Sequence, residues 1–367
     1  MQVASWPSGA KEAEALRSYG VNITPGHMDG YYSKPKAELD TSLVAKPWES
    51  SVLEQMGPDK HILCDSVEGW NNEEFLFEIR EGIAYCTLNR PSANNAMNDA
   101  ISAGLHDAAR ILRSRPDIRV VVLTGNGRLF CAGGDYKAFQ SAAMGSAEEG
   151  AVDEIDKPLG PRIVKCAETI LTAGDGVDMK KGFARDLLEW ASLPQFTICC
   201  LNGSAMGAGV GLVAVCDMVI AQKTAHISLA EVKLGVIPSD IAPYVVRTVG
   251  GTNAKQLFAT ADNLNMKRAM EIGLVQQVVS DPAAFPGVIA EVAKKIQMTA
   301  PGALSASKKA LFNCVDEPIC ESMMGYLSTE YARVRKSEEC MEGMKALSSK
   351  QRPGWAQTTI NVKEVVA

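Results

Sequence analysis

The chain lacks the features that mark membrane proteins, disulfide-rich secreted proteins and simple metalloproteins. No apolar run reaches the roughly 18 to 20 residues of a membrane span, and no basic segment followed by an apolar one opens the N-terminus. The ten cysteines form no CxxC pair, and the four histidines form no HxxxH or HExxH arrangement. We therefore expect an intracellular protein with reduced cysteines, no membrane span and no metal site. The mitochondrial matrix or another organelle stays open beside the cytoplasm, although Glu12 and Glu14 interrupt the pattern of a transit peptide.

An excess of basic charge is also missing. The formal net charge is -6, from 37 basic and 43 acidic residues. Because nucleic-acid phosphates require a basic surface, this balance argues against a nucleic-acid partner. An anionic small ligand would need a locally basic site. With 46% hydrophobic and 22% charged residues, the 367-residue chain has the composition of a globular protein of one or two domains.

The chain divides into three parts. Residues 1–70 are rich in Pro, Gly and charge and lack sustained periodicity, which predicts an irregular N-terminal extension. Residues 71–285 alternate strand-like and helix-like segments, the pattern of an α/β core. This core carries a long polar insertion at about 140–176. Residues 286–367 have a helical pattern and are predicted to form a helical C-terminal domain and tail.

Within the core, residues 75–80 and 83–89 are two β-rich runs about Glu81-Gly82, a hairpin signal. Residues 98–113 have helical spacing, and the continuous apolar run 118–125 is typical of a buried strand in a parallel sheet. The later elements follow the same alternation. They are a helix at about 179–190, a strand at 196–203, a helix at 209–216, strands at 218–222 and 226–231, helices from about 241 and a strand at 274–280.

Two glycine-containing loops follow predicted strands. One reads FCAGGD, from Phe130 to Asp135, and the other covers residues 203–209 before an apolar helix. Strand-end loops of one parallel sheet meet at the same edge, where ligands bind in open α/β sheets. Exposed backbone N–H groups near the start of a helix can stabilise negative charge on oxygen. Such loops cannot transfer a proton by themselves, so an acid or base is needed nearby.

A series of segments in the same order resembles the crotonase superfamily, also called the enoyl-CoA hydratase/isomerase superfamily. The segments are LNRPSANNAMN, AGGD, NGSAMGAG, CDMVIA, AEVKLGVIP, AMEIGLVQQVV and SEECMEGMKALSSKQRPGW, and they span about residues 75–355. In motif they are most similar to the methylglutaconyl-CoA hydratase-like branch. The resemblance implies a crotonase (ClpP-like) ββα superhelix core with a helical C-terminal trimerisation domain. It also implies a homotrimer or hexamer and a CoA thioester as substrate, with no tightly bound cofactor.

The resemblance assigns roles to individual positions. The amides of Gly134 and Ala208 match the oxyanion hole that holds the thioester oxygen of an enolate. Glu231 matches the carboxylate that delivers or removes a proton at the α-carbon, and burial beside an acyl pocket would raise its pKa. The positions that match the CoA-binding residues are Ala93, Asn95, Ala96, Ala132 and Lys137.

Gly211 departs from the family pattern, because a standard hydratase has there a second glutamate that helps to hold the attacking water. Asp240 is a candidate replacement for this acid, or it caps a helix that begins at about Ile241, a role that suits Asp. A glutamate at position 211 would be aimed toward Glu231 by a helix that begins near Ala208. We therefore expect Gly211→Glu to raise hydratase activity if nothing compensates for the missing acid.

The resemblance favours hydration of an α,β-unsaturated or branched acyl-CoA through an enolate. Double-bond isomerisation, which needs one carboxylate, and thioester hydrolysis are the enzymatic alternatives. A further alternative is a catalytically inactive subunit of a larger assembly. The missing acid at Gly211 supports it, as do the segments 1–70 and 140–176, which could contact a protein partner.

Overall fold

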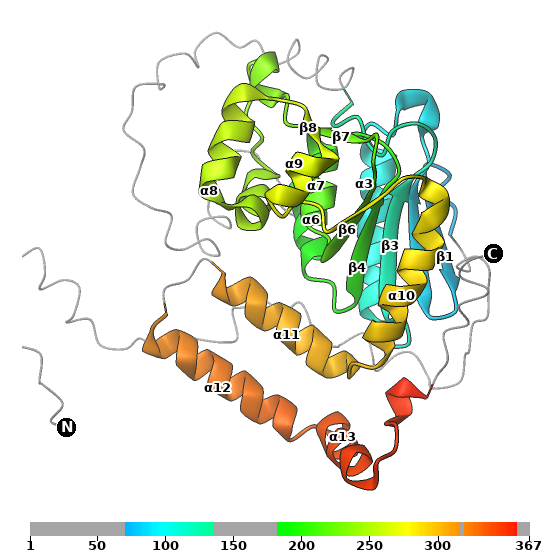
Figure 1. Cartoon of the computed structure of the whole chain (residues 1–367), viewed down its shortest axis with the longest axis vertical. Coiled ribbons are helices and arrows are strands. Elements are labelled where there is room, and N and C mark those ends of the chain that lie inside the picture. The colour runs from blue at the N-terminus through cyan, green and yellow to red at the C-terminus, as the bar shows by residue number, and fades with distance from the viewer. Residues whose placement is uncertain (1–69, 136–181, 316–318, 358–367) are drawn as a thin grey trace, which may run out of the picture. The chain divides into compact units, whose positions relative to one another are not determined.

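The computed structural model of the chain describes residues 70–135, 182–315 and 319–357 (Figure 1). All of them belong to one compact unit that spans residues 55–367. The extension 1–69, the insertion at about 140–176 and Lys137 lie outside the described residues, so the predictions for them stay predictions. Within the described ranges no helix is both long and apolar enough to cross a membrane.

The core contains a six-stranded sheet in the order β1-β2-β3-β4-β6-β9. The strands β1 and β2 are antiparallel, and every other neighbouring pair is parallel. Glu81 and Gly82 join β1 to β2 with φ values of 51° and 72°, the left-handed conformation that a tight hairpin turn requires. The predicted hairpin is therefore correct. The strands are β1 (Phe75–Arg80), β2 (Ile83–Leu88), β3 (Val120–Gly125), β4 (Phe196–Leu201), β6 (Met218–Gln222) and β9 (Gln277–Val279).

A second, three-stranded sheet has the order β5-β7-β8. Its strands are β5 (Ala205–Met206), β7 (His226–Ser228) and β8 (Leu264–Asn265). β5 pairs in parallel with β7, and β7 pairs antiparallel with β8. The strand predicted over 226–231 ends at Ser228, because Glu231–Leu234 forms a 3-10 helix, η3, that is closed by Gly235 at φ 76°. Glu231 thus lies on a helical turn rather than on a strand.

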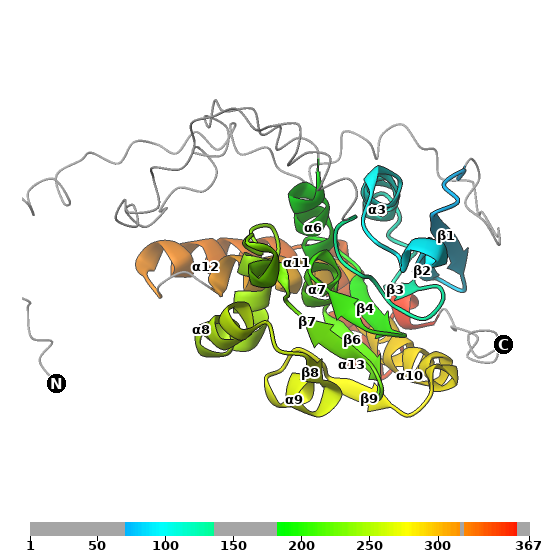
Figure 2. The same ribbon diagram turned by 90° about the horizontal axis from the view of Figure 1, so that it is seen from above.

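Helices cover both faces of the six-stranded sheet. Figure 2 shows α3 (Asp99–Arg113) and α10 (Phe285–Gln297) on opposite sides of it. Alternate residues of β3 enter two separate cores: Val121 and Leu123 pack in the cluster that includes α3, and Val120 and Val122 pack against α10. The prediction that the run 118–125 is a strand buried on both faces is confirmed. The remaining helices of this region are α6 (Phe183–Ala191), α7 (Ala208–Ala214), α8 (Ala242–Thr260) and α9 (Met266–Glu271).

The C-terminal region is helical, as predicted. It consists of α11 (Pro301–Cys314), α12 (Glu321–Arg335) and α13 (Glu338–Ser349), and the short 3-10 helices elsewhere are η2 (Pro91–Ala93), η4 (Pro282–Ala284) and η5 (Gly354–Ala356). Lys308 on α11 forms an ion pair with Asp217 at the start of β6, which ties this helix to the sheet. Apolar side chains on these helices stay exposed, among them Leu311, Tyr331 and Leu347 at 65%, 67% and 74%.

Candidate functional site

The first glycine-containing loop follows β3 and is held by Met97. The Met97 amide donates to the Gly133 carbonyl at 2.7 Å, and the Asp135 amide donates to the Met97 carbonyl at 3.0 Å. In such a parallel bridge the middle residue, Gly134, directs its own N–H and C=O away from Met97. Among the described residues, no acceptor is found for the Gly134 N–H. This amide is therefore free to bind a ligand oxygen.

The second loop joins β5 to α7. The Met206 amide donates to the Cys131 carbonyl at 2.9 Å, and the Gly207 amide donates to the Ser228 carbonyl at 3.0 Å. Ala208 is the first residue of α7, and the first amides of a helix have no partner within the helix. In the part of the chain that the structure describes, the Ala208 N–H has no other acceptor either. The two amides predicted from the sequence are thus both unpaired.

The two loops and Glu231 lie against one another. A Cβ atom built on Gly133, whose φ is 98°, would lie 3.1 Å from the Met206 carbonyl oxygen. A Cβ atom on Gly207 would lie 3.7 Å from the Gly133 Cα and 3.3 Å from Oε1 of Glu231. Glycine at these two positions therefore lets the loops approach closely. The approach brings a carboxylate beside both loops.

Glu231 has an unsatisfied oxygen. Its Oε2 is buried and has no hydrogen-bond partner among the described residues. Burial raises the pKa of Glu231 above the usual value, because removal from water disfavours the charged form. An unpaired buried carboxyl oxygen is costly to folding, and groups of this kind often mark a place that a ligand or water occupies. Glu231 has the properties that a general acid or base requires.

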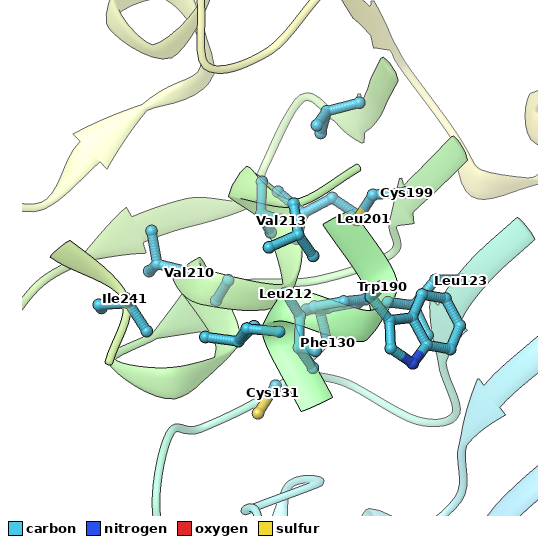
Figure 3. Packing of buried hydrophobic residues seen from close by; sticks show 14 of the residues in the cluster. Leu123, Phe130, Cys131, Trp190, Cys199, Leu201, Val210, Leu212, Val213 and Ile241 are labelled. Carbon is cyan, nitrogen blue, oxygen red and sulfur yellow. The ribbon is translucent and has the colours of Figure 1, made fainter. Parts of the chain in front are cut away.

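One turn beyond Ala208, the space beside Gly211 is filled with hydrocarbon. A Cβ atom on Gly211 would lie 2.4 Å from Cγ2 of Ile241 and 3.2 Å from Cδ1 of Leu187. Both of these side chains are buried, and Figure 3 shows Ile241 beside α7. The structure corrects the expectation that this position would accommodate a glutamate. Any side chain at 211 would collide with Ile241 before it reached Glu231.

Asp240 is exposed, and one of its carboxylate oxygens accepts a hydrogen bond from the Ser239 hydroxyl at 3.1 Å. The capping alternative is wrong: α8 begins at Ala242, its N-cap residue is Ile241, and no side chain caps it. The Ala242 amide instead donates to the Pro238 carbonyl at 2.9 Å. The role of Asp240 as a second acid stays a prediction.

Three of the predicted CoA-binding positions, Ala93, Asn95 and Ala96, lie on a turn next to the first loop, which carries Ala132. Asn94 and Asn95 adopt left-handed conformations, and the Ala132 amide donates to the Asn94 carbonyl at 3.0 Å. The Asn95 side chain is buried and binds the Arg90 amide and the carbonyls of Asn126 and Leu129. Its amide nitrogen and its oxygen are therefore both engaged within the protein. Within the described ranges no group of three His, Cys, Asp or Glu could hold a metal ion.

Two residues near the site were not identified from the sequence. Ile241 fills the space beside Gly211, although 29 residues lie between the two in the sequence. Its apolar side chain is the only feature of the sequence that indicates a buried position. Arg90 forms an ion pair with Asp135, the neighbour of Gly134, at 2.8 Å. A signal for Arg90 was present, because a charged residue directly after a buried strand lies at the ligand-binding edge of the sheet.

Comparisons with known proteins identify relatives over most of the chain. The enoyl-CoA hydratase/isomerase family model matches residues 78–183 and 174–358. The chain is 28% identical to the (E)-benzylidenesuccinyl-CoA hydratase of Thauera aromatica, over 76% of this chain and 97% of the relative. It is also 28% identical to the 1,2-epoxyphenylacetyl-CoA isomerase of Escherichia coli (strain K12), over 77% of this chain and 97% of the relative.

Among solved structures, Pseudomonas aeruginosa AtuE is similar, with a TM-score of 0.65 and 30% identity over 78% of this chain and all of that chain. An enoyl-CoA hydratase/isomerase from Marinobacter aquaeolei gives a TM-score of 0.63 and 27% identity over 77% of this chain. The residues that the family model matches include nearly all of the sheet, the two loops and the C-terminal helices. The chain therefore belongs to the enoyl-CoA hydratase/isomerase family and has the crotonase fold.

Proposed function

We propose that the protein is an acyl-CoA enzyme that forms an enolate and moves a proton with one carboxylate. The amides of Gly134 and Ala208 bind the thioester oxygen, and Glu231 transfers the proton at the α-carbon. The observation that carries this proposal is the meeting of two unpaired amides with a buried, unpaired carboxyl oxygen. Preorganised amide donors stabilise the charge that develops on oxygen, and removal of one donor typically costs roughly 3 to 4 kcal/mol in the transition state.

The filled space at Gly211 favours isomerisation of the double bond. Glu231 as a carboxylate removes an α-proton from a 3-enoyl thioester, and the electron pair of the C–H bond moves into a dienolate. The same carboxyl group then returns the proton to the γ-carbon, which gives the conjugated 2-enoyl thioester. No water enters this sequence, so it needs no second acid. Ile241 and Leu187, which occupy the place beside Gly211, cannot accept a hydrogen bond from water.

Hydration is the second candidate. It rests on Glu231 and on the relatives, since the similar proteins of equal identity include a hydratase as well as an isomerase. In this reaction Glu231 alone would take a proton from water and deliver one to the α-carbon, or Asp240 would act with it. Thioester hydrolysis and a catalytically inactive subunit complete the set of alternatives.

A panel of 3-enoyl-, 2-enoyl- and hydroxyacyl-CoA thioesters tests the proposal. We expect a 3-enoyl thioester to gain the ultraviolet absorbance of the conjugated product and to release no free CoA thiol. Loss of that absorbance from a 2-enoyl thioester would favour hydration, and release of the thiol would favour hydrolysis. A protein that neither turns over any of these thioesters nor binds CoA would be an inactive subunit.

The exposed apolar side chains of the C-terminal helices support assembly into a homotrimer or hexamer. Large apolar side chains are costly to leave in water, and where they gather on a surface they often mark an interface. Lys137 and the backbone at Ala93 and Ala96 are proposed to bind CoA. We expect light scattering to give a multiple of the 39.3 kDa protomer. A monomer at micromolar concentration would contradict this assembly.

A further inference from the structure

Arg90 contacts the residue that follows the proposed oxyanion donor. Its Nη1 donates to Oδ2 of Asp135 at 2.8 Å and to the Ala96 carbonyl at 3.2 Å. Both charged side chains are largely buried, with 22% of Arg90 and 18% of Asp135 exposed. Such an ion pair is screened by water much less than a surface pair.

This contact bridges the two segments that build the turn at Gly134. Ala96 precedes Met97, and Met97 binds Gly133 and Asp135 on either side of Gly134. One guanidinium nitrogen therefore holds the carbonyl of one segment and the carboxylate of the other. Arg90 is itself fixed, because its backbone amide donates to Oδ1 of Asn95 at 2.8 Å.

A second carboxylate extends the network to α3. Nε of Arg90 lies 3.6 Å from Oε1 of Glu74, and Nδ2 of Asn98 donates to Oε2 of Glu74 at 2.7 Å. Asn98 also caps α3, since its Oδ1 accepts from the Ile101 amide at 3.0 Å. Arg90 is thus joined to the start of β1, the N-terminus of α3 and the Gly134 turn.

The charge of Asp135 matters for the chemistry. A carboxylate one residue from Gly134 would repel the negative charge that develops on the thioester oxygen, and this repulsion is strong where water is scarce. The positive charge of Arg90 at 2.8 Å offsets it. We infer that Arg90 is a positioning residue of the oxyanion site, which holds the Gly134 turn in place and neutralises Asp135. This inference rests on the proposed function.

The test combines kinetics with vibrational spectroscopy of a bound saturated acyl-CoA, which cannot react but presents the thioester carbonyl. In the wild-type protein, hydrogen bonds from the oxyanion site should lower the carbonyl stretching frequency. We expect Arg90→Gln to shrink this shift and to lower kcat by roughly tenfold to a hundredfold, the size expected for a small misplacement of catalytic groups. KM is followed separately, because Arg90 also donates to the carbonyl of Ala96, a proposed CoA-binding position.

Three further variants separate charge from packing. Arg90→Lys keeps the charge and should retain more of the frequency shift than Arg90→Gln. The double variant Arg90→Gln/Asp135→Asn also removes the negative charge next to Gly134 and should recover part of the lost kcat. Arg110→Gln is the matched control, since Arg110 is a surface residue of α3 with 70% of its side chain exposed, and it should leave both measurements unchanged.

The outcomes distinguish this inference from the proposed function. A wild-type protein that binds the acyl-CoA without any carbonyl shift, or does not bind it, would overturn the oxyanion site and the role of Arg90 together. A normal shift in the wild type that Arg90→Gln leaves intact would overturn the role of Arg90 alone. If Arg90→Gln does not fold, as circular dichroism would reveal, the double variant takes its place. An undiminished shift in that variant would then contradict positioning by Arg90.

Discussion

Two positions one turn apart on the short helix α7 differ in what they offer to a substrate. At its start, the Ala208 amide is unpaired and follows a loop that contacts Glu231, whose Oε2 is buried without a partner among the described residues. At Gly211, in the middle of the helix, the space is occupied by Ile241 and Leu187. The first position offers a hydrogen-bond donor beside a carboxyl group. The second offers only hydrocarbon.

This difference indicates that the two halves of the hydration chemistry, formation of the enolate and activation of water, are separable in this fold. The half that makes an enolate needs two amides and one carboxylate, which are present. The half that holds an attacking water needs a further acceptor, and hydrocarbon occupies the place beside Gly211. The glycine at 211 and the isoleucine at 241 therefore belong together as one packing unit, and a change in either alone should be disruptive.

The largest effect is expected from Gly211→Glu. The new side chain would collide with Ile241, and overpacking of a core typically costs about 1 to 3 kcal/mol. A buried carboxyl group without partners adds about 1 to 3 kcal/mol or more. We expect urea denaturation to show a loss of about 3 kcal/mol or more in the free energy of unfolding, with no gain in activity.

Gly251→Glu is the matched control for this variant. Gly251 follows a kink at Gly250 within α8, and a Cβ atom there would meet nothing within 4 Å. Because an acidic residue is favourable at the start of a helical segment, this control should be neutral or stabilising by roughly 0.3 to 1 kcal/mol. In the double variant Gly211→Glu/Ile241→Ala, the smaller alanine leaves room for the glutamate. Hydratase activity in this double variant, but not in Gly211→Glu, would confirm that Ile241 closes the space beside Gly211. Full stability of the single variant would contradict the packing described here.

A smaller effect, on activity only, is expected from Glu231→Gln. Loss of general acid/base assistance should lower kcat by a factor on the order of 100 or more, which corresponds to about 2.7 kcal/mol. CoA binding should persist. Full activity in steady-state assays would show that Glu231 has a structural role.

Stability provides the control for Glu231→Gln. Since burial raises the pKa of Glu231, the folded protein holds this proton more tightly than the unfolded chain does. The contribution of Glu231 to stability is therefore fully present at pH values below its pKa in the unfolded chain. It is lost as the pH rises through its higher pKa in the folded protein. Glutamine, which cannot ionise, should leave the protein at least as stable near neutral pH. A marked fall in stability would mean that lost activity reflects unfolding.

The pH dependence of kcat/KM should show a moderate effect of the same group. Glu231 must be ionised to remove a proton, so activity should fall as the pH drops through its raised pKa. The acid limb should therefore lie above the value of about 4.3 that is typical of an exposed glutamate. A profile that stays flat down to that value would be inconsistent with a buried carboxylate as the base.

The smallest effect is expected from Asp240→Asn. Asp240 is exposed and hydrogen-bonded to Ser239, so an enzyme that uses Glu231 alone should keep nearly all of its turnover. Asp262→Asn, a change at another exposed acid, which follows the end of α8, serves as the control. Complete loss of activity in Asp240→Asn alone would instead assign Asp240 as the second acid.

Much of this arrangement could be predicted from the sequence, because periodicity and the order of motifs depend on local chemistry. The hairpin at Glu81-Gly82 and the doubly buried strand β3 are examples. The meeting of the loops at Gly133 and Gly207 follows from the rule that parallel strands end at one edge. The occupant of the space beside Gly211 could not be predicted, because tertiary packing brings Ile241 there from a different segment.

The predicted cap at Asp240 failed for a related reason. A residue suited to capping acts as a cap only where the helix begins at its position, and α8 begins two residues later, after Ile241. Ile241 therefore closes the space at Gly211 and also occupies the N-cap position that was predicted for Asp240.

The partition of products in isotopically labelled water tests the central claim most directly. A 3-enoyl-CoA and its 2-enoyl isomer would each be incubated with the protein in H₂¹⁸O, and the products would be analysed by mass spectrometry, with Glu231→Gln as the blank. Isomerisation by Glu231 predicts interconversion of the two enoyl thioesters without ¹⁸O in the acyl chain. Rapid formation of an ¹⁸O-labelled hydroxyacyl-CoA that depends on Glu231 would contradict it and would show that water is activated despite the closed space at Gly211.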